Sequence, residues 1–271
     1  MSSHLNFYII AGVTLLLWVI ALIGYLPPVA ARLRFPLGPV AFALGWLVMV
    51  GYMAWLWHAL ERPPLRTQGE TRMWYTLCLP VIGLAVEWRW RTRTLAYPTI
   101  IMGMVFLIIT LLHPETLDKS MMPALRSPWF APHVIVYMVS YATLGIAAAL
   151  AGWALIRSGF TQNPELARAV EEGQRLIYIG FPFLTAGLIF GAFWAKIAWG
   201  HYWSWDPKET WAFMTWAMYL AYIHLARYTR LAPRTQLALM AGAFVVLLGC
   251  WFGVNNLPSA QMSIHTYSGT D

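Results

Sequence analysis

Charged residues are scarce in this chain, and most of them stand in short clusters between long apolar runs. Only 11% of the 271 residues are charged and 59% are hydrophobic, whereas about 25% of the residues are charged in an ordinary soluble domain. A chain with so little charge cannot cover a water-exposed surface, which excludes a soluble globular protein and an intrinsically disordered one. The composition therefore predicts an all-α, polytopic membrane protein.

Uncharged stretches predict about eight transmembrane helices, because about 20 apolar residues cross a hydrocarbon core about 30 Å thick. The stretches are Phe7–Leu26, Leu37–Leu60, Met73–Val86, Leu95–Leu112, His133–Ile156, Leu176–Ala195, Thr210–Ala226 and Leu237–Val254. No signal-peptide cleavage pattern follows the first stretch, so we expect it to be retained. The sequence shows no internal repeat, low-complexity tract or linker, which predicts one transmembrane domain over residues 1–271.

The positions of Lys and Arg predict the orientation of these helices. Alternate connections hold 11 of the 18 basic residues, namely Arg32, Arg34, Arg89, Arg91, Arg93, Arg157, Arg168, Arg175, Arg227, Arg230 and Arg234. The remaining connections hold the other seven. By the positive-inside rule the first set lies in the cytoplasm. Both termini and the connections 61–72, 113–132 and 196–209 are then external. Because this rule explains the Arg clusters, the net charge of +7 does not indicate nucleic-acid binding.

A tryptophan-rich segment precedes and begins the seventh predicted helix. Residues Trp194–Trp216 hold six of the 16 tryptophans, whereas an interfacial aromatic belt places one or two at each helix end. Trp199, Trp203 and Trp205 fall in the predicted external loop before this helix. An external loop with so many rings predicts a flat, rigid aromatic surface.

The start of the seventh helix carries a strong capping signal. Asp206 is a good N-cap, Pro207 suits the first helical position, and Glu209 completes a capping-box pattern. Lys208 adds positive charge to the helix N-terminus. An aromatic shelf beside a cationic helix end suits a flat, apolar ligand with carboxylate tails, and haem fits that description. An interfacial belt with a capped helix is the alternative interpretation.

Histidines on the same predicted side strengthen the haem interpretation. His133 begins the fifth predicted helix at its external end, and His265 lies in the external tail, so two imidazoles could ligate one iron from its two faces. His224 lies 15 residues after Glu209, or about 22 Å along a helix, which places a further candidate deep in the membrane or near its inner face. A packing role is the alternative for each histidine. His58 and His201 are weaker candidates.

Three segments of the sequence resemble a known family. The run W-G-H-Y-W-S-W-D-P-K-E-T-W, from Trp199 to Trp211 and continued by Trp216, resembles the WWD haem-handling domain, and its K-E-T-W continuation resembles the CcsA (ResC) family of system II cytochrome c biogenesis. The segment around His133 and the tail around His265 resemble the family segments that hold its two external histidines. The resemblance is specific over 120–271 and looser over 60–120.

The resemblance implies a role for each of these residues. His133 and His265 would be external axial ligands of the haem iron, and His224 would be a transmembrane haem ligand on the inward side. The WWD segment 194–216 would hold the haem edge, with Trp199, Trp203, Trp205, Asp206, Trp211 and Trp216 among its haem-contacting residues. A further transmembrane histidine would come from the partner, CcsB (ResB), although His58 is another candidate.

The function implied is that of the haem-handling subunit of a cytochrome c synthase in the bacterial inner membrane. Haem b would be carried to the external face and positioned for thioether attachment to the C-x-x-C-H motif of apocytochrome c. CcsB, apocytochrome c and thiol-reducing proteins are the partners expected, and nucleic acid is not. The alternatives are a haem exporter or chaperone without ligation activity, and a b-type quinol oxidoreductase. No acid–base pair stands out, because Asp206 and Glu209 are better explained as capping residues.

Overall fold

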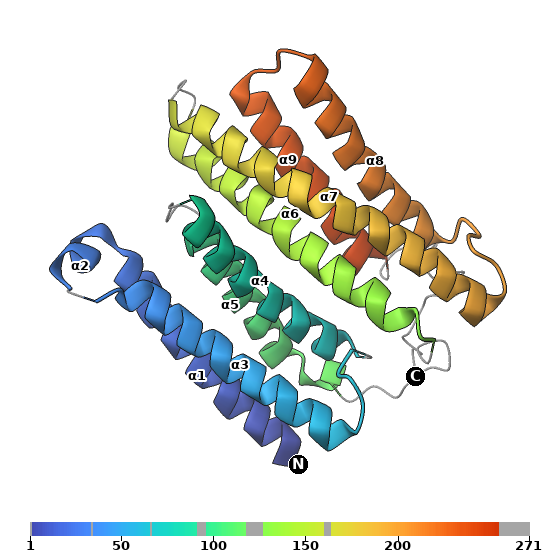
Figure 1. Ribbon diagram of the computed structural model, residues 1–271, viewed down its shortest axis with the longest axis horizontal. Helices are drawn as coiled ribbons and strands as arrows, with labels where there is room; N and C mark the ends of the chain where they lie inside the picture. The colour runs from blue at the N-terminus through green and yellow to red at the C-terminus, as the bar shows by residue number, and fades with distance from the viewer. Residues whose placement is uncertain are drawn as a thin grey trace. The chain divides into compact units, whose positions relative to one another are not determined.

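The computed structural model describes residues 2–33, 35–65, 67–90, 96–117, 127–159 and 164–254. Over these residues the chain forms helices joined by short connections and contains no strand (Figure 1). The predicted all-α class is therefore confirmed. The chain divides into two compact units, Met1–Met121 and Met122–Asp271. The single domain over 1–271 stays a prediction beside this division.

The first unit is built around two antiparallel helix pairs. Its elements are α1 (Ser2–Tyr25), α2 (Pro27–Arg32), α3 (Leu37–Leu60), α4 (Gln68–Trp90), α5 (Ala96–Leu112) and the short 3₁₀ helix η1 (Pro114–Leu117). Trp18 of α1 is fully buried and donates a 3.2 Å hydrogen bond to the Phe42 carbonyl. A Cβ atom on Gly45 or Gly103 would lie 2.5–2.6 Å from the Trp18 ring. These two glycines therefore allow α3 and α5 to approach α1 closely.

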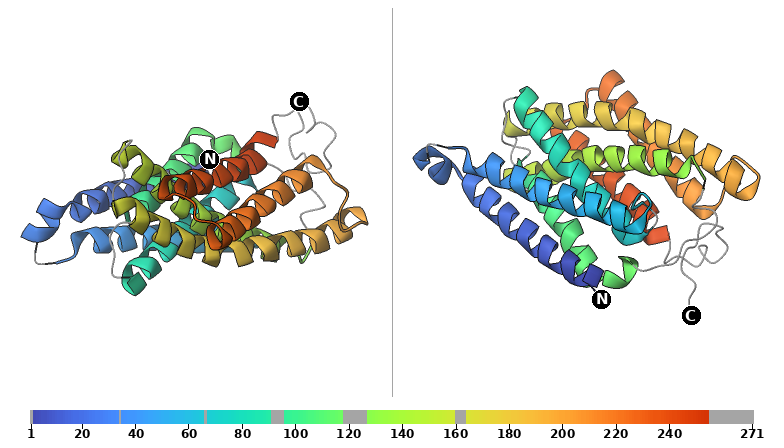
Figure 2. Two further views of the ribbon diagram at one scale, coloured as in Figure 1. Left: turned by 90° about the horizontal axis from the view of Figure 1, so that it is seen from above. Right: turned by 60° about the horizontal axis from the view of Figure 1, so that its bottom comes forward.

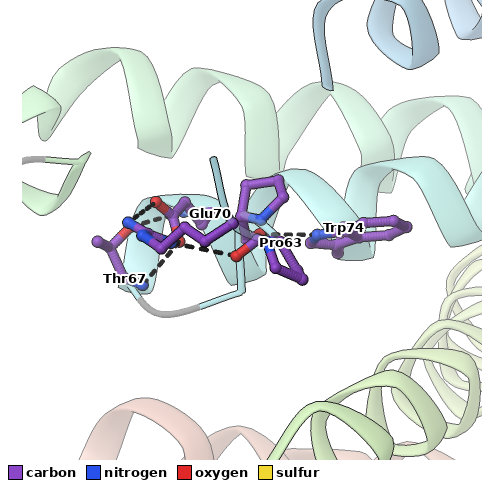
Figure 3. A network of polar contacts seen from close by, with 6 residues as sticks. Pro63, Thr67, Glu70 and Trp74 are labelled. Atoms are coloured by element: carbon purple, nitrogen blue, oxygen red, sulfur yellow. Dashed lines mark hydrogen bonds and ion pairs between the residues drawn. The ribbon is translucent and has the colours of Figure 1, made fainter. Parts of the chain in front are cut away.

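The helix α4 begins with a capping box. The Thr67 hydroxyl accepts from the Glu70 backbone N–H at 3.0 Å, and the Glu70 carboxylate accepts from the Thr67 N–H at 3.2 Å. Arg62 adds two donors to the same carboxylate, at 2.9 and 3.1 Å (Figure 3). Trp74 donates to the Pro64 carbonyl at 2.7 Å. These bonds attach the turn after α3 to the first two turns of α4.

The second unit contains the four helices that carry the predicted site. These are α6 (Phe130–Ser158), α7 (Pro164–Trp199), α8 (Pro207–Tyr228) and α9 (Pro233–Leu248), and α9 continues into a π-helical turn, η3 (Gly249–Gly253). α6 packs along α7 and also contacts α9, and Figure 2 shows α8 beside α9. α6 is the most deeply buried of the long apolar helices described. Within this unit α6 is thus packed against α7 and α9.

Five helices of the described chain are long and apolar enough to cross a membrane. They are Asn6–Tyr25, Leu37–Leu60, Phe130–Ser158, Glu165–Trp199 and Pro233–Gly253, and Ala96–Leu112 is a shorter apolar helix. This confirms a polytopic helical membrane protein. The predicted stretches Met73–Val86 and Thr210–Ala226 lie in α4 and α8, which are not among these five. The number of eight crossings stays a prediction.

The helix α7 is longer than its apolar stretch. It begins at Pro164 and has 36 residues, which corresponds to about 54 Å and exceeds the hydrocarbon core. The connection expected at 157–175 is therefore helical from Pro164 onwards. Its charges form i,i+4 pairs, Arg168 with Glu172 and Arg175 with Glu171. Such pairs support a helix in water, and the hydropathy pattern alone did not reveal them.

Candidate functional site

The predicted cap of α8 is present in the structure. Asp206 precedes the helix and its carboxylate accepts from the Lys208 N–H at 2.8 Å, while Glu209 completes the capping box. One oxygen of Glu209, Oε2, accepts from the Asp206 N–H at 3.2 Å, the Ser204 N–H at 2.7 Å and the Ser204 hydroxyl at 3.3 Å. Glu209 therefore holds the turn before the helix as well as the helix start.

The turn held in this way presents exposed aromatic rings. Trp205 has φ +59°, a left-handed conformation that bulky residues rarely adopt. Its side chain is 64% exposed, and Tyr202 is 53% exposed. Trp199 was predicted in this turn but is the last residue of α7. The reason is local, since Lys196 in the last turn of α7 donates to the Gly200 carbonyl at 2.7 Å and extends the helix to this point.

The positive charge expected at the start of α8 is carried by a partly buried side chain. Lys208 is half-buried, and burial lowers the pKa of its ammonium group, although Cys250 and Asp206 act in the opposite direction. Burial penalises the charged form because the surroundings solvate it less well than water does.

The turn of residues 200–206, between α7 and α8, is called the Trp turn below. One row of aromatic rings leads from it onto α8 and α7. Trp203 contacts Trp205 with ring centroids 5.8 Å apart, and Trp205 contacts Phe213 at the same separation. Phe213 stacks on Trp216 at 5.9 Å, and Trp216 stacks on Phe181 at 5.8 Å. Trp203, Trp205 and Trp216 of the predicted site therefore belong to one continuous row.

Trp216 is further fixed in this row by a hydrogen bond. Its indole N–H donates to the Thr185 hydroxyl of α7 at 3.0 Å. The Thr185 hydroxyl in turn donates to the Phe181 carbonyl at 3.0 Å. Both the plane and the position of this indole are thus set by α7.

A second row of rings contains the predicted ligand His133. Trp199 contacts Trp194 at 5.0 Å, and Trp194 contacts His133 at 5.4 Å. On its other side His133 meets Tyr137 edge-on at 4.6 Å, and Tyr137 stacks on Tyr141 at 5.2 Å. The structure therefore joins His133 to the tryptophan-rich segment through Trp194, a residue that the sequence did not single out as a ligand contact.

The hydrogen bond of His133 defines its tautomer. Its Nδ1 lies 2.9 Å from the Gly187 carbonyl oxygen of α7. A carbonyl oxygen only accepts hydrogen bonds, so Nδ1 carries a proton, and in the neutral imidazole Nε2 carries the lone pair. Metal-binding histidines usually donate their second ring N–H to a carboxylate or a backbone carbonyl in this way. The imidazole of His133 is thus prepared to ligate a metal through Nε2.

Trp211 lies at the junction of α8 with the π-helical turn. A Cβ atom on Gly249, the residue where the π-helical turn begins, would lie 2.8 Å from the Trp211 ring. Cys250 in the same turn donates a weak hydrogen bond to the Lys208 carbonyl, at 3.9 Å. Single π-helical turns often mark functional sites, and this one directly precedes the segment that contains His265. His265 itself lies outside the described residues.

His224 lies far along α8 from these rings. Its side chain is exposed on the surface of the chain, and its Nδ1 lies 2.8 Å from the Leu220 carbonyl of the same helix. By the same argument Nδ1 donates the proton of this hydrogen bond. The nearest ring contact is with Tyr228, at 6.1 Å. Within the one helix α8, His224 lies 15 residues after Glu209, or about 22 Å along the axis.

The weaker histidine candidates lie on other elements. His58 is exposed in the last turn of α3, and His201 is exposed in the turn after α7. His113 follows α5 and pairs with Glu115 at 3.1 Å. Among the described residues, no ring contact joins these histidines to either aromatic row.

These features define a polytopic helical membrane protein with a capped, tryptophan-rich turn and a histidine held in a single tautomer. The model of the family described as "Cytochrome C assembly protein" matches residues 9–260. The chain belongs to this family, and within it to the CcsA family. The match begins well before residue 60, where the resemblance in the sequence was expected to start.

Individual relatives agree with this assignment. The chain is 32% identical over 269 residues to the cytochrome c biogenesis protein CcsA of Heterosigma akashiwo, an alignment that covers 82% of this chain and 81% of the relative. It is 37% identical over 203 residues to CcsA of Prochlorococcus marinus, covering 64% and 65%. Among solved structures, cytochrome c haem lyase CcmF has a similar fold, with TM-score 0.67, 18% identity and coverage of 93% of this chain and 47% of CcmF.

Proposed function

We propose that this protein is the haem-handling subunit of a cytochrome c synthase. Haem b is its substrate, held at the external face between His133 and His265 and against the Trp turn. The observation that supports this proposal most is the Nδ1 hydrogen bond of His133 to Gly187, which directs the lone pair to Nε2. Membership of the CcsA family supports a role in cytochrome c maturation.

The chemistry required of such a site is mainly positioning. Each cysteine of the apocytochrome C-x-x-C-H motif adds its S–H across a haem vinyl group: a C–S bond forms, the C=C double bond becomes single, and the proton ends on the neighbouring carbon. No electrons are gained or lost in this addition, although the haem has to be ferrous. The protein therefore has to hold one face and edge of the haem and exclude water.

The aromatic rows fit this task. Trp199, Trp203, Trp205 and Trp216 provide flat rings in the two rows, and Trp211 of α8 packs against Gly249 at the π-helical turn. Asp206 and Glu209 act by fixing the backbone of the turn, because both carboxylates accept backbone hydrogen bonds. Neither carboxylate is required as an acid or base for the addition.

His224 belongs to an earlier stage of the haem path in this proposal. It is exposed on α8, so a haem bound there lies on the surface of the chain and needs a second ligand from elsewhere. A CcsB (ResB) subunit in the bacterial inner membrane is the proposed source. The orientation proposed is that of the basic clusters, with both termini and the Trp turn external.

The central test removes the external ligands. His133→Gly and His265→Gly, each produced with the CcsB partner, should abolish holocytochrome formation, and added imidazole should restore part of it by filling the vacant position. Impermeant cysteine labelling at Ser204→Cys and Ser268→Cys in spheroplasts tests the side of the membrane. Full activity of both glycine variants contradicts the ligand assignment.

A second test separates the two haem positions. His224→Ala should lower the haem that copurifies with the complex, measured as pyridine haemochrome, whereas the external variants should lose activity and keep haem at the inner site. Normal haem content and normal cytochrome yield in His224→Ala would make His224 a packing residue. Holocytochrome formation is also assayed with only this chain and its partner present. Its formation there excludes a haem exporter or chaperone without ligation activity.

A further inference from the structure

The contact between α6 and α7 repeats the same arrangement twice. Ser140 of α6 donates its hydroxyl to the Gly180 carbonyl of α7 at 3.0 Å. Seven residues away on both helices, His133 donates Nδ1–H to the Gly187 carbonyl at 2.9 Å. At each position a side chain of α6 thus reaches a backbone carbonyl of an α-helix, which already accepts a bond within its own helix.

The absence of side chains at two glycines of α7 leaves the Gly187 carbonyl accessible to α6. A Cβ atom on Gly187 would lie 2.3 Å from the Tyr137 ring, and one on Gly191 would lie 2.9 Å from Cε1 and 3.0 Å from Nδ1 of His133. Gly191 is one turn after Gly187, next to the carbonyl in question. A methyl group there meets the very nitrogen that makes the hydrogen bond. The pair Gly187-x-x-x-Gly191 therefore forms the surface on which the imidazole rests.

We propose that Gly187 and Gly191 are positioning residues that set the tautomer and the ring orientation of His133. This inference rests on the proposed function of His133 as a haem ligand. The Gly187 carbonyl accepts from Nδ1–H, the missing Cβ of Gly191 lets the ring reach it, and Tyr137 and Trp194 both contact the ring. The Nε2 lone pair then points in a single fixed direction.

The first repeat provides a matched control. A Cβ atom on Gly180 would lie 2.9 Å from a Leu144 methyl group, the same separation that Gly191 shows to His133. Gly180→Ala therefore disturbs the same helix pair to a similar extent without touching an imidazole. Gly152 of α6 has nothing within 4 Å of an added Cβ, and Gly152→Ala controls for the substitution itself.

The experiment compares these three variants in the full chain produced with its CcsB partner. Gly191→Ala should lower holocytochrome per folded protein about ten-fold or more, as loss of an orienting partner of a metal-binding histidine does, and added imidazole should recover part of it. The haem spectrum should lose the low-spin contribution of the external site. Gly180→Ala and Gly152→Ala should keep wild-type yield per folded protein and a wild-type spectrum. Equal losses in Gly180→Ala and Gly191→Ala would overturn the inference.

A double variant keeps the test decisive if Gly191→Ala accumulates poorly. Removing the ring makes room for the new methyl group, so His133→Gly with Gly191→Ala should accumulate like His133→Gly alone. If the double variant accumulates less than His133→Gly alone, the methyl group at residue 191 clashes with a group other than the imidazole, and the inference is overturned. Because residues in contact are coupled, the effects of His133→Gly and Gly191→Ala on accumulation should not simply add in the double variant.

A haem-free measurement separates this inference from the proposed function. The ring ¹⁵N chemical shifts of His133, identified by their absence in His133→Gly, should report the Nδ1–H tautomer in the wild type and a mixture of tautomers in Gly191→Ala. Unchanged shifts would overturn the inference. Full activity of His133→Gly would instead overturn the proposed function and leave the tautomer result valid.

Discussion

Two turns of this protein, one in each unit, connect helices and share the same local backbone features. The turn of residues 61–70 leads from α3 into α4, and the turn of residues 200–209 leads from α7 into α8. Each contains a non-glycine residue with a left-handed backbone, Glu61 with φ +51° and Trp205 with φ +59°. Each ends in a capping box whose glutamate is nearly fully buried.

The two glutamates differ in what they hold. Both carboxylate oxygens of Glu70 accept hydrogen bonds, one from Arg62 and the other from Arg62 and Thr67. Glu209 uses only Oε2, and its buried Oε1 has no hydrogen-bond partner among the described residues. The first turn is thus closed by a charge pair, whereas the second is held by one oxygen and presents tryptophans on its surface. The same capping motif serves stability in one unit and supports a candidate binding surface in the other.

The largest effect on the free energy of unfolding is expected for Glu70→Gln. The amide NH₂ has to face either Arg62 or the Thr67 N–H, so a donor meets a donor. We expect a loss of about 2–3 kcal/mol, measured as a lower unfolding midpoint in detergent. Glu165→Gln, at an exposed pair with 3.9 Å separation, is the control and should change little. Equal midpoints for the two variants would contradict this account of the first turn.

Glu209→Ala should cost somewhat less stability and considerably more function. The N–H groups of Ser204 and Asp206 lose their acceptor, which corresponds to about 1–2 kcal/mol since water can reach the exposed Ser204. Because the Trp turn is then no longer fixed, holocytochrome yield per folded protein should fall, while Glu70→Gln should keep that ratio. A yield that falls equally in both variants would remove the functional distinction between the turns.

Glycine at the left-handed positions should separate strain from function. Glu61→Gly should be neutral or stabilise by up to about 1 kcal/mol, because glycine adopts this conformation freely at a helix C-terminus. Trp205→Gly relieves similar strain but loses the rings of Trp203 and Phe213 as neighbours. Its stability should change by less than about 1 kcal/mol, whereas its holocytochrome yield should drop. Wild-type yield in Trp205→Gly would show that this ring is dispensable.

The smallest effect is expected for Glu209→Gln. The amide oxygen can replace Oε2 and keep its three donors, while the NH₂ group takes the place of Oε1, which accepts no hydrogen bond from the described residues. The midpoint should shift by less than about 0.5 kcal/mol in free energy. A loss as large as that of Glu209→Ala would show that the charge of Glu209, rather than its hydrogen bonds, holds the turn.

Local pattern predicted much of this protein. Each uncharged run overlaps one helix of the described chain, α1 or one of α3 to α9, and Asp206, Pro207 and Glu209 located the start of α8 and its capping box. The start of α7 was missed because hydropathy measures the thickness of the bilayer rather than the length of a helix. The i,i+4 pairs of Arg168 and Arg175 with their glutamates were the available signal.

The sequence by itself determined the helices, the cap and the clustering of tryptophans, because these depend on neighbours within one or two helical turns. Only the tertiary structure decided what His133 contacts, since its hydrogen-bond partner, Gly187, lies 54 residues away. That contact requires two helix backbones to approach closely, which depends on the missing Cβ atoms of Gly187 and Gly191 facing α6. A pattern of glycines indicates that such an approach is allowed, but which side chain fills the space is decided by the packing of α6 on α7.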